Sequence, residues 1–211
     1  MKYIPLGFQC TVSDILKSMN KRTSSLPFDW MLSRPEFVYN ILELLFSDMS
    51  IDEIVREHFF NCKENANFYA IEYFKVGEGT SLYNRKYNVI FPHDTFDEEN
   101  IQKYIRRLTH LKDIIINEDN ITFIYISPSS NLKGNFFIDD VCQINEDDIT
   151  LYFNKIVSII TRQRSNFKFL MFDTFPKSKI KLDDRIERYV IPAKEDFVKI
   201  QPDIIDILKN K

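Results

Sequence analysis

The chain has 211 residues, of which 44% are hydrophobic and 14% aromatic, so it can bury a sizeable core, which argues against intrinsic disorder. The formal net charge of −3 gives no general basic field. We therefore expect the protein to bind neither nucleic acid nor an anionic membrane surface.

The first residues, MKYIPLGFQC, hold no apolar run of signal-peptide length, and no later stretch approaches the roughly 20 apolar residues of a membrane-spanning helix. We therefore expect a cytoplasmic protein. Cys10, Cys62 and Cys142 are widely spaced and odd in number. This pattern predicts neither a disulfide framework nor a structural zinc site.

The first half of the chain begins with a strand over Lys2–Leu6, a break at Gly7 and a helix over Thr11–Asn20. A second helix is predicted to begin at Pro35, and a short one to cover Ile51–Phe59. Two strands, Asn67–Phe74 and Tyr83–Phe91, flank the turn Gly77-Glu78-Gly79, which predicts a hairpin.

The second half alternates helices with buried strands. Acidic residues Asp97, Glu98 and Glu99 open a long helix that ends near Asn117. The elements predicted after it are a strand over Ile121–Ser127, a helix over Glu146–Gln163, a strand over Phe167–Phe172, a strand over Arg188–Ile191 and a helix over Pro202–Leu208.

This alternation predicts an α/β protein with three layers, in which a mixed, mostly parallel sheet carries helices on both faces. No internal repeat or linker divides the chain, so residues 1–211 are expected to form a single domain. The polar segment Ser127–Asp148 is longer than a typical connection and is predicted to be a mobile loop over a site.

Cys10 is the one plausible chemical centre of this sequence. It falls in the first turn of a helix at the carboxyl end of the first strand, where ligands bind in open α/β sheets. The helix dipole and free backbone N–H groups there would stabilise a thiolate and lower the cysteine pKa. The alternative is a small buried hydrophobic side chain, which is the commoner fate of a lone cysteine.

A cysteine nucleophile needs a base, and the chain has three histidines. His93 is the best candidate because it follows a predicted strand in the sequence FPHD. His110 falls inside the long helix, and His58 precedes Phe59 and Phe60, where packing or capping is the expected role.

An aspartate should orient the imidazole ring of that base. Asp94 is adjacent to His93, but neighbouring side chains of an extended segment point in opposite directions. Asp29 in SLPFDW and Asp173 after a core strand are better placed, although either may serve as a turn or cap carboxylate.

Three further side chains are candidates for substrate binding, together with Asp173. Trp30 lies beside Asp29, and its alternative role is to anchor the loop on the core. Arg106 and Arg107 could bind a phosphate or carboxylate, or could simply form a solvated helix face.

The common cofactor and hydrolase fingerprints are missing from the sequence. There is no GxSxG, HExxH or dinucleotide-binding motif, and the Gly77-Glu78-Gly79 turn lacks the ending of a phosphate loop. We therefore predict no cofactor and no set of metal ligands.

Four segments occur in the order LGFQCTVSDILK, RTSSLPFDW, FPHD and KYIRRL. Together they resemble a family labelled putative papain-like cysteine peptidases, in which a Leu-Gly-x-x-Cys strand end is followed by Pro-Phe-Asp-Trp and then by a His-Asp pair before a helix with paired arginines. The resemblance covers about the first half of the chain and continues weakly through Ile121–Ser127. It implies Cys10 as nucleophile, His93 as base, and Asp94 or Asp29 as the acidic partner.

The label also implies a fold in which a cysteine-bearing helix packs against an antiparallel sheet. This chain instead begins with a strand and then alternates. Its order is more similar to esterase and acyltransferase folds in which the nucleophile follows the first strand.

We predict a cysteine-dependent acyl-group enzyme, whether peptidase, amidase or acyltransferase, with a small-molecule, glycan or peptide substrate. One alternative is a non-enzymatic module that binds a sugar, nucleotide or protein partner through Arg106 or Arg107 and Ser127–Asp148. Another is a metal-dependent phosphoesterase that uses Asp29, Asp94 and Asp173. The sequence predicts no particular oligomeric state.

Overall fold

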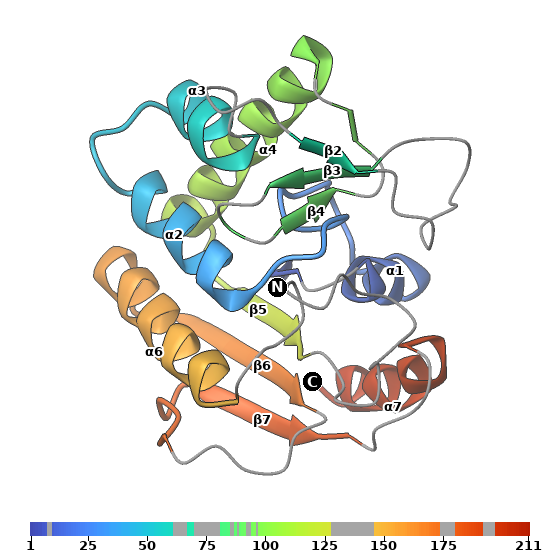
Figure 1. Cartoon of the computed structure of the whole chain (residues 1–211). Coiled ribbons are helices and arrows are strands. Elements are labelled where there is room, and N and C mark those ends of the chain that lie inside the picture. Colours follow the sequence, from blue (N-terminus) through green and yellow to red (C-terminus); the bar gives the residue numbers. More distant parts are fainter. Residues whose placement is uncertain are drawn as a thin grey trace.

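A computed structural model describes residues 1–7, 10–60, 67–69, 81–84, 87, 89–91, 94–95, 97–127, 146–173, 180–191 and 197–211, and Figure 1 shows their arrangement. The strands are β1 (Lys2–Pro5), β2 (Asn67–Tyr69), β3 (Ser81–Asn84), β4 (Val89–Phe91), β5 (Ile121–Ile126), β6 (Phe167–Asp173) and β7 (Ile186–Val190). The helices are α1 (Thr11–Ser18), α2 (Pro35–Leu45), α3 (Ile51–Ile54), the π-helix η1 (Val55–Phe59), α4 (Glu98–Asn117), α6 (Glu146–Gln163) and α7 (Phe197–Lys209).

The central sheet of the described residues has the strand order β1-β5-β6-β7, and each neighbouring pair is parallel. The sequence of β5, ITFIYI, is buried at every position, as expected of a parallel strand covered on both faces. Because the strands are parallel, their carboxyl ends meet at one edge of the sheet. The candidate site lies at that edge of the sheet.

Helices cover both faces of the central sheet. Helix α1 packs beside α7, and α2 packs beside α6 on the other side of the sheet (Figure 1). The three-layer α/β architecture predicted from the sequence is confirmed. The central sheet is parallel throughout, because the antiparallel strands belong to a separate sheet.

Aromatic rings fill the core between the sheet and α6. Phe123 of β5 stacks on Phe169 of β6, with 4.8 Å between the ring centroids. Tyr125 lies 4.5 Å from Phe153 of α6, measured in the same way, and all four side chains are fully buried. Burial of each such side chain contributes about 1.5–3 kcal/mol, so this layer holds the strands that carry the site.

The second sheet has three antiparallel strands in the order β2-β3-β4. The single strand predicted over Tyr83–Phe91 is wrong, because the chain reverses between β3 and β4, where Asn84 pairs with Val89. The polar sequence RKYN between them interrupts the apolar alternation and favours a turn. The Gly77-Glu78-Gly79 turn lies outside the described residues.

The last helix is longer than the sequence predicts. It begins at Phe197, and Pro202, which was predicted to start it, lies inside it. Pro202 cannot donate a backbone hydrogen bond, but α7 buries Ile204 and Leu208 and packs on α1. This packing offsets the local cost of the proline. A helix start predicted from the sequence pattern alone does not include such tertiary packing.

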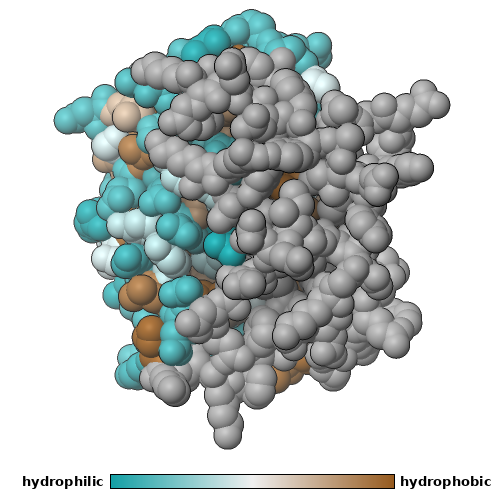
Figure 2. Space-filling view, viewed as in Figure 1, coloured by the Kyte–Doolittle hydropathy of each residue, from teal (hydrophilic) through white to brown (hydrophobic). Residues whose placement is uncertain are grey.

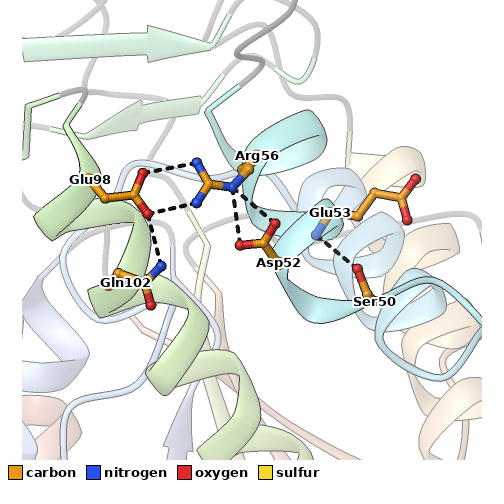
Figure 3. Close-up of polar contacts among 6 residues, drawn as sticks. All are labelled: Ser50, Asp52, Glu53, Arg56, Glu98 and Gln102. Carbon is orange, nitrogen blue, oxygen red and sulfur yellow. Dashed lines mark hydrogen bonds and ion pairs between the residues drawn. The ribbon is translucent and has the colours of Figure 1, made fainter.

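The predicted helix over Ile51–Phe59 is confirmed as α3 followed by one π-helical segment, η1. Figure 3 shows how Arg56 of η1 binds Asp52 and, through two nitrogens at 3.0 and 2.7 Å, the carboxylate of Glu98 at the start of α4. The hydrogen bonds from Arg56 lower the pKa of Glu98 to about 2. The pair is exposed, so it orients α4 more than it stabilises the fold.

Figure 2 shows the described residues at the left of the molecule, over α2 and α6, where hydrophilic side chains predominate and hydrophobic ones are scattered. This distribution is that of an ordinary water-facing surface. Among the described residues, no helix has the length and apolar character needed to cross a bilayer.

Candidate functional site

Cys10 lies where the sequence predicts it, after the carboxyl end of β1 and at the N-cap of α1. Strand β1 is held in the sheet by its pairing with β5, and Leu6 continues the ladder with a hydrogen bond to the Ile124 carbonyl at 2.9 Å. The first backbone hydrogen bond of the helix joins Asp14 N–H to the Cys10 carbonyl at 2.9 Å. The thiol is half-buried.

The electrostatics of this thiol differ from the prediction. Burial raises the pKa of Cys10, and the negative charge of Asp14, one helical turn away, raises it further. A hydrogen bond from its own backbone acts in the opposite direction but is a smaller influence. Burial and Asp14 therefore outweigh the lowering of the pKa that was predicted from the helix dipole. They favour a protonated Cys10 thiol in the free protein.

The turn between β1 and α1 depends on Gly7. Its φ of +91° lies in the region that side chains disfavour, and a Cβ atom there would overlap the hydroxyl of Ser33. The same Cβ would lie 3.7 Å from the carbonyl oxygen of Phe28. The Cys10 turn therefore packs directly against the loop that carries the Pro-Phe-Asp-Trp motif.

That loop, residues 21–34, also binds the second sheet. Leu32 and Ile90 of β4 exchange backbone hydrogen bonds of 2.9 and 3.0 Å, which form an isolated antiparallel bridge. Strand β4 comes just before the His-Asp pair in the sequence. The loop, which carries the Pro-Phe-Asp-Trp motif, therefore contacts both the turn before Cys10 and the strand before the His-Asp pair. This shared position in space supports treating them as one site.

Asp29 is fully buried inside the loop. Its Oδ2 atom accepts hydrogen bonds from Arg22 at 2.7 Å and from the backbone N–H of Leu26 at 2.9 Å. Its Oδ1 atom is buried and has no hydrogen-bond partner in the described part of the chain. The guanidinium of Arg22 also lies 5.3 Å from the ring centroid of Trp30, so one ion pair fixes both residues of the motif.

Asp94 is 5% exposed and is held by α4. Its Oδ2 atom accepts a hydrogen bond of 2.6 Å from the hydroxyl of Tyr104, and its Oδ1 atom is bound by Lys103. Tyr104 is fully buried, and its pKa is raised well above its ordinary value by that burial and then by the charge of Asp94. Both carboxylate oxygens of Asp94 are thus directed to helix α4.

The predicted base, His93, lies outside the described residues, so its role stays a prediction. The other two histidines contact hydroxyl groups, and only for His58 was a packing or capping role expected. His58 Nδ1 lies 2.5 Å from the Tyr87 hydroxyl, and His110 Nε2 lies 3.0 Å from the Ser24 hydroxyl.

A pocket of about 290 Å³ is lined by Trp30, Asp94, Lys103 and Arg107. Lys103 and Arg107 are one turn apart on α4 and share a face. Arg106 is exposed on another face of the helix and is not among the described residues that line the pocket. Of the four predicted substrate-binding residues, Trp30 and Arg107 thus line one pocket, whereas Arg106 and Asp173 do not.

Asp173 lies elsewhere, at the end of β6. It accepts a 2.7 Å hydrogen bond from the hydroxyl of Ser127, which follows β5, and it pairs with Arg188 of β7. Asp173 therefore links β6 to both of its neighbours in the sheet, β5 and β7. Residues 128–145, most of the segment predicted to be a loop over a site, lie outside the described residues.

The three aspartates considered as metal ligands each pair with a different basic residue: Asp29 with Arg22, Asp94 with Lys103 and Asp173 with Arg188. The described part of the chain holds no group of three His, Cys, Asp or Glu side chains suited to a metal ion. No sequence motif identifies Arg22 and Arg188 as these partners. The spacing of Lys103 and Arg107 could have identified that face of α4.

The fold and these contacts define an α/β protein with a half-buried cysteine beyond its first parallel strand. The chain belongs to the family described as "Putative papain-like cysteine peptidase (DUF1796)", whose model matches residues 1–171. No curated protein and no solved structure matches the sequence. The match includes Cys10, the buried loop and the α4 pocket, and it ends just before Asp173. The parallel central sheet differs from the antiparallel one that the family label implies.

Proposed function

We propose that the protein is a cysteine-dependent acyl-group enzyme in which Cys10 is the nucleophile and His93 the base. The observation that carries the proposal is the position of Cys10, half-buried at the start of α1 and beyond the carboxyl end of β1. Its turn packs against the loop that bridges to β4, the strand before His93.

In the proposed reaction His93 accepts the thiol proton as the Cys10 sulfur bonds to a carbonyl carbon of the substrate. The imidazolium then returns that proton to the leaving group as the carbon–leaving-group bond breaks, which leaves a thioester. Water, an amine or a hydroxyl group next attacks the thioester and restores the thiol. A base is required at the moment of attack, because the surroundings of Cys10 raise its pKa.

The start of α1 can stabilise the oxyanion of this reaction. The first helical hydrogen bond is made by the N–H of Asp14, so the N–H groups of Thr11, Val12 and Ser13 have no acceptor within the helix. They lie at the positive end of the helix dipole, in the turn of α1 that follows Cys10.

Asp29 is the better acidic partner for His93. Among the described residues, one of its buried carboxylate oxygens has no hydrogen-bond partner, whereas both oxygens of Asp94 are bound by α4. An imidazole N–H from His93 would satisfy that oxygen, which would otherwise be a costly unpaired acceptor.

The test is acylation by an activated ester, p-nitrophenyl acetate, followed by mass spectrometry of each cysteine peptide. We expect release of p-nitrophenol with an acetyl group on Cys10 in the wild type and in H110A, the matched histidine control. Cys10→Ala should release none above background while melting normally. Equal release by Cys10→Ala, or acetylation confined to Cys62 or Cys142, would end the proposal.

The raised pKa of Cys10 favours one other function, a binding module whose thiol is not used. This alternative predicts that Cys10 is not acetylated and that His93→Ala has no effect. It also predicts that the α4 pocket binds its ligand in the absence of any turnover.

A further inference from the structure

The α4 pocket combines an aromatic wall with basic side chains. Trp30 comes from the buried loop, Asp94 from the segment before α4, and Lys103 and Arg107 from successive turns of α4. A volume of about 290 Å³ accommodates a small molecule or the end group of a larger one. The loop that supplies Trp30 also contacts Gly7, three residues before Cys10.

Among the described residues that line the pocket, the charges do not balance. Lys103 is committed to Asp94 and to the side chain of Asn100. Arg107 lies 5.3 Å from the ring centroid of Tyr104 and has no acidic partner among the described residues. Two cations thus face one carboxylate, and the excess charge is on a guanidinium whose planar donors match an oxyanion.

The carboxylate of Asp94 does not compete for that guanidinium. Its two oxygens accept from Tyr104 and Lys103, and Tyr104 remains a neutral donor because its pKa is raised. Tyr104 also gives Arg107 an aromatic surface that orients it without neutralising it. The positive charge of Arg107 is therefore available to a ligand at the pocket wall.

We infer that the pocket lined by Trp30, Lys103 and Arg107 is an oxyanion-binding subsite that takes a carboxylate or a phosphate group. The assignment of that group to the acyl substrate rests on the proposed function, whereas the binding itself does not. The substrate class would then be an acyl compound with a negative charge a short distance from the reacting carbonyl.

Trp30 is the one tryptophan in the chain, so its fluorescence reports directly on the pocket. The experiment titrates sodium phosphate and, separately, sodium succinate at a constant ionic strength of about 0.15 M kept with sodium chloride. The variants are Arg107→Gln and, as matched control, Arg106→Gln, which removes an equal charge from the exposed neighbouring position. Melting temperatures provide a second readout of binding.

We expect a saturable change in the wild type and in R106Q, and an apparent affinity about tenfold weaker in R107Q. The phosphate and succinate arms identify which anion fits. Cys10→Ala should bind as the wild type does, so loss of the acyl chemistry would leave this result intact. No saturable fluorescence change and no melting shift with either anion, or equal binding by R107Q, would overturn the inference.

Discussion

Asp14 and Cys10 form an unusual pair for a proposed nucleophile, because the carboxylate opposes the thiolate that the reaction requires. The two residues are one turn apart in α1, and Asp14 is the largest charged influence that raises the Cys10 pKa. Burial and Asp14 together favour a protonated Cys10 thiol, which is less prone to oxidation than a thiolate.

Replacement of Asp14 with asparagine should lower the pKa of Cys10, since it removes a negative charge and keeps the side-chain size. The rate of Cys10 alkylation by iodoacetamide at pH 7, measured by mass spectrometry, should rise. Asp184→Asn is the control, because Asp184 is exposed before β7, towards the opposite end of the sheet. An unchanged rate in D14N would show that its charge does not govern the thiol.

Gly7 is the residue on which the shape of the site most depends. Gly7→Ala should lower the free energy of unfolding by about 1–3 kcal/mol, because alanine disfavours a positive φ and its Cβ would overlap the Ser33 hydroxyl. Ser33→Ala alone should cost little, since that hydroxyl is buried and the described residues offer it no hydrogen-bond partner. Urea unfolding should show a smaller loss for G7A/S33A than for G7A, and equal losses would contradict the contact.

At the scale of elements, the loop over residues 21–34 is held by one buried ion pair. Arg22 satisfies one oxygen of Asp29 and covers Trp30. Removal of one partner from a buried ion pair leaves the other charge without compensation, which is far more costly than removal of both.

Arg22→Met should therefore lower the free energy of unfolding by roughly 3 kcal/mol or more. The double variant R22M/D29N should recover part of that loss, because asparagine carries no charge and can still accept from the Leu26 N–H. Denaturant unfolding of the three proteins measures both effects. If the double variant is less stable than R22M, the ion pair is not what holds the loop.

The elements themselves were largely predictable. Continuous apolar runs identified β5 and β6 as buried parallel strands, and Pro35 and the acidic residues before Ile101 marked the starts of α2 and α4. The turn between β3 and β4 was missed because short strands leave too few alternating positions to reveal a break. The start of α7 was missed because packing on α1 outweighs the proline.

The site was predictable in part. The position of Cys10 followed from the strand end before it, and Asp29 was a candidate from its place in SLPFDW, although its burial was not predicted. The partners of those residues did not follow, because Arg22, Tyr104 and Arg188 are brought in by tertiary contacts that leave no periodic signal. The pKa of Cys10 was predicted to be lowered and is instead raised, because the sequence pattern reveals the helix dipole but not the burial of the thiol or the effect of Asp14.

At the scale of the whole molecule, the parallel sheet is what makes a site from distant segments. It places the carboxyl ends of β1, β5, β6 and β7 at one edge, and the loop beside Cys10 extends the contact to β4 and α4. We propose that this convergence pairs Cys10 with His93 as nucleophile and base.

The most direct test of that claim is the rate of Cys10 acetylation by p-nitrophenyl acetate as a function of pH, in the wild type and in His93→Ala. We expect the rate to fall roughly 100-fold or more in H93A near pH 7, and the two rates to converge at high pH, where the thiolate needs no base. H110A should follow the wild-type profile. Superimposed profiles for the wild type and H93A would contradict the pairing of Cys10 with His93.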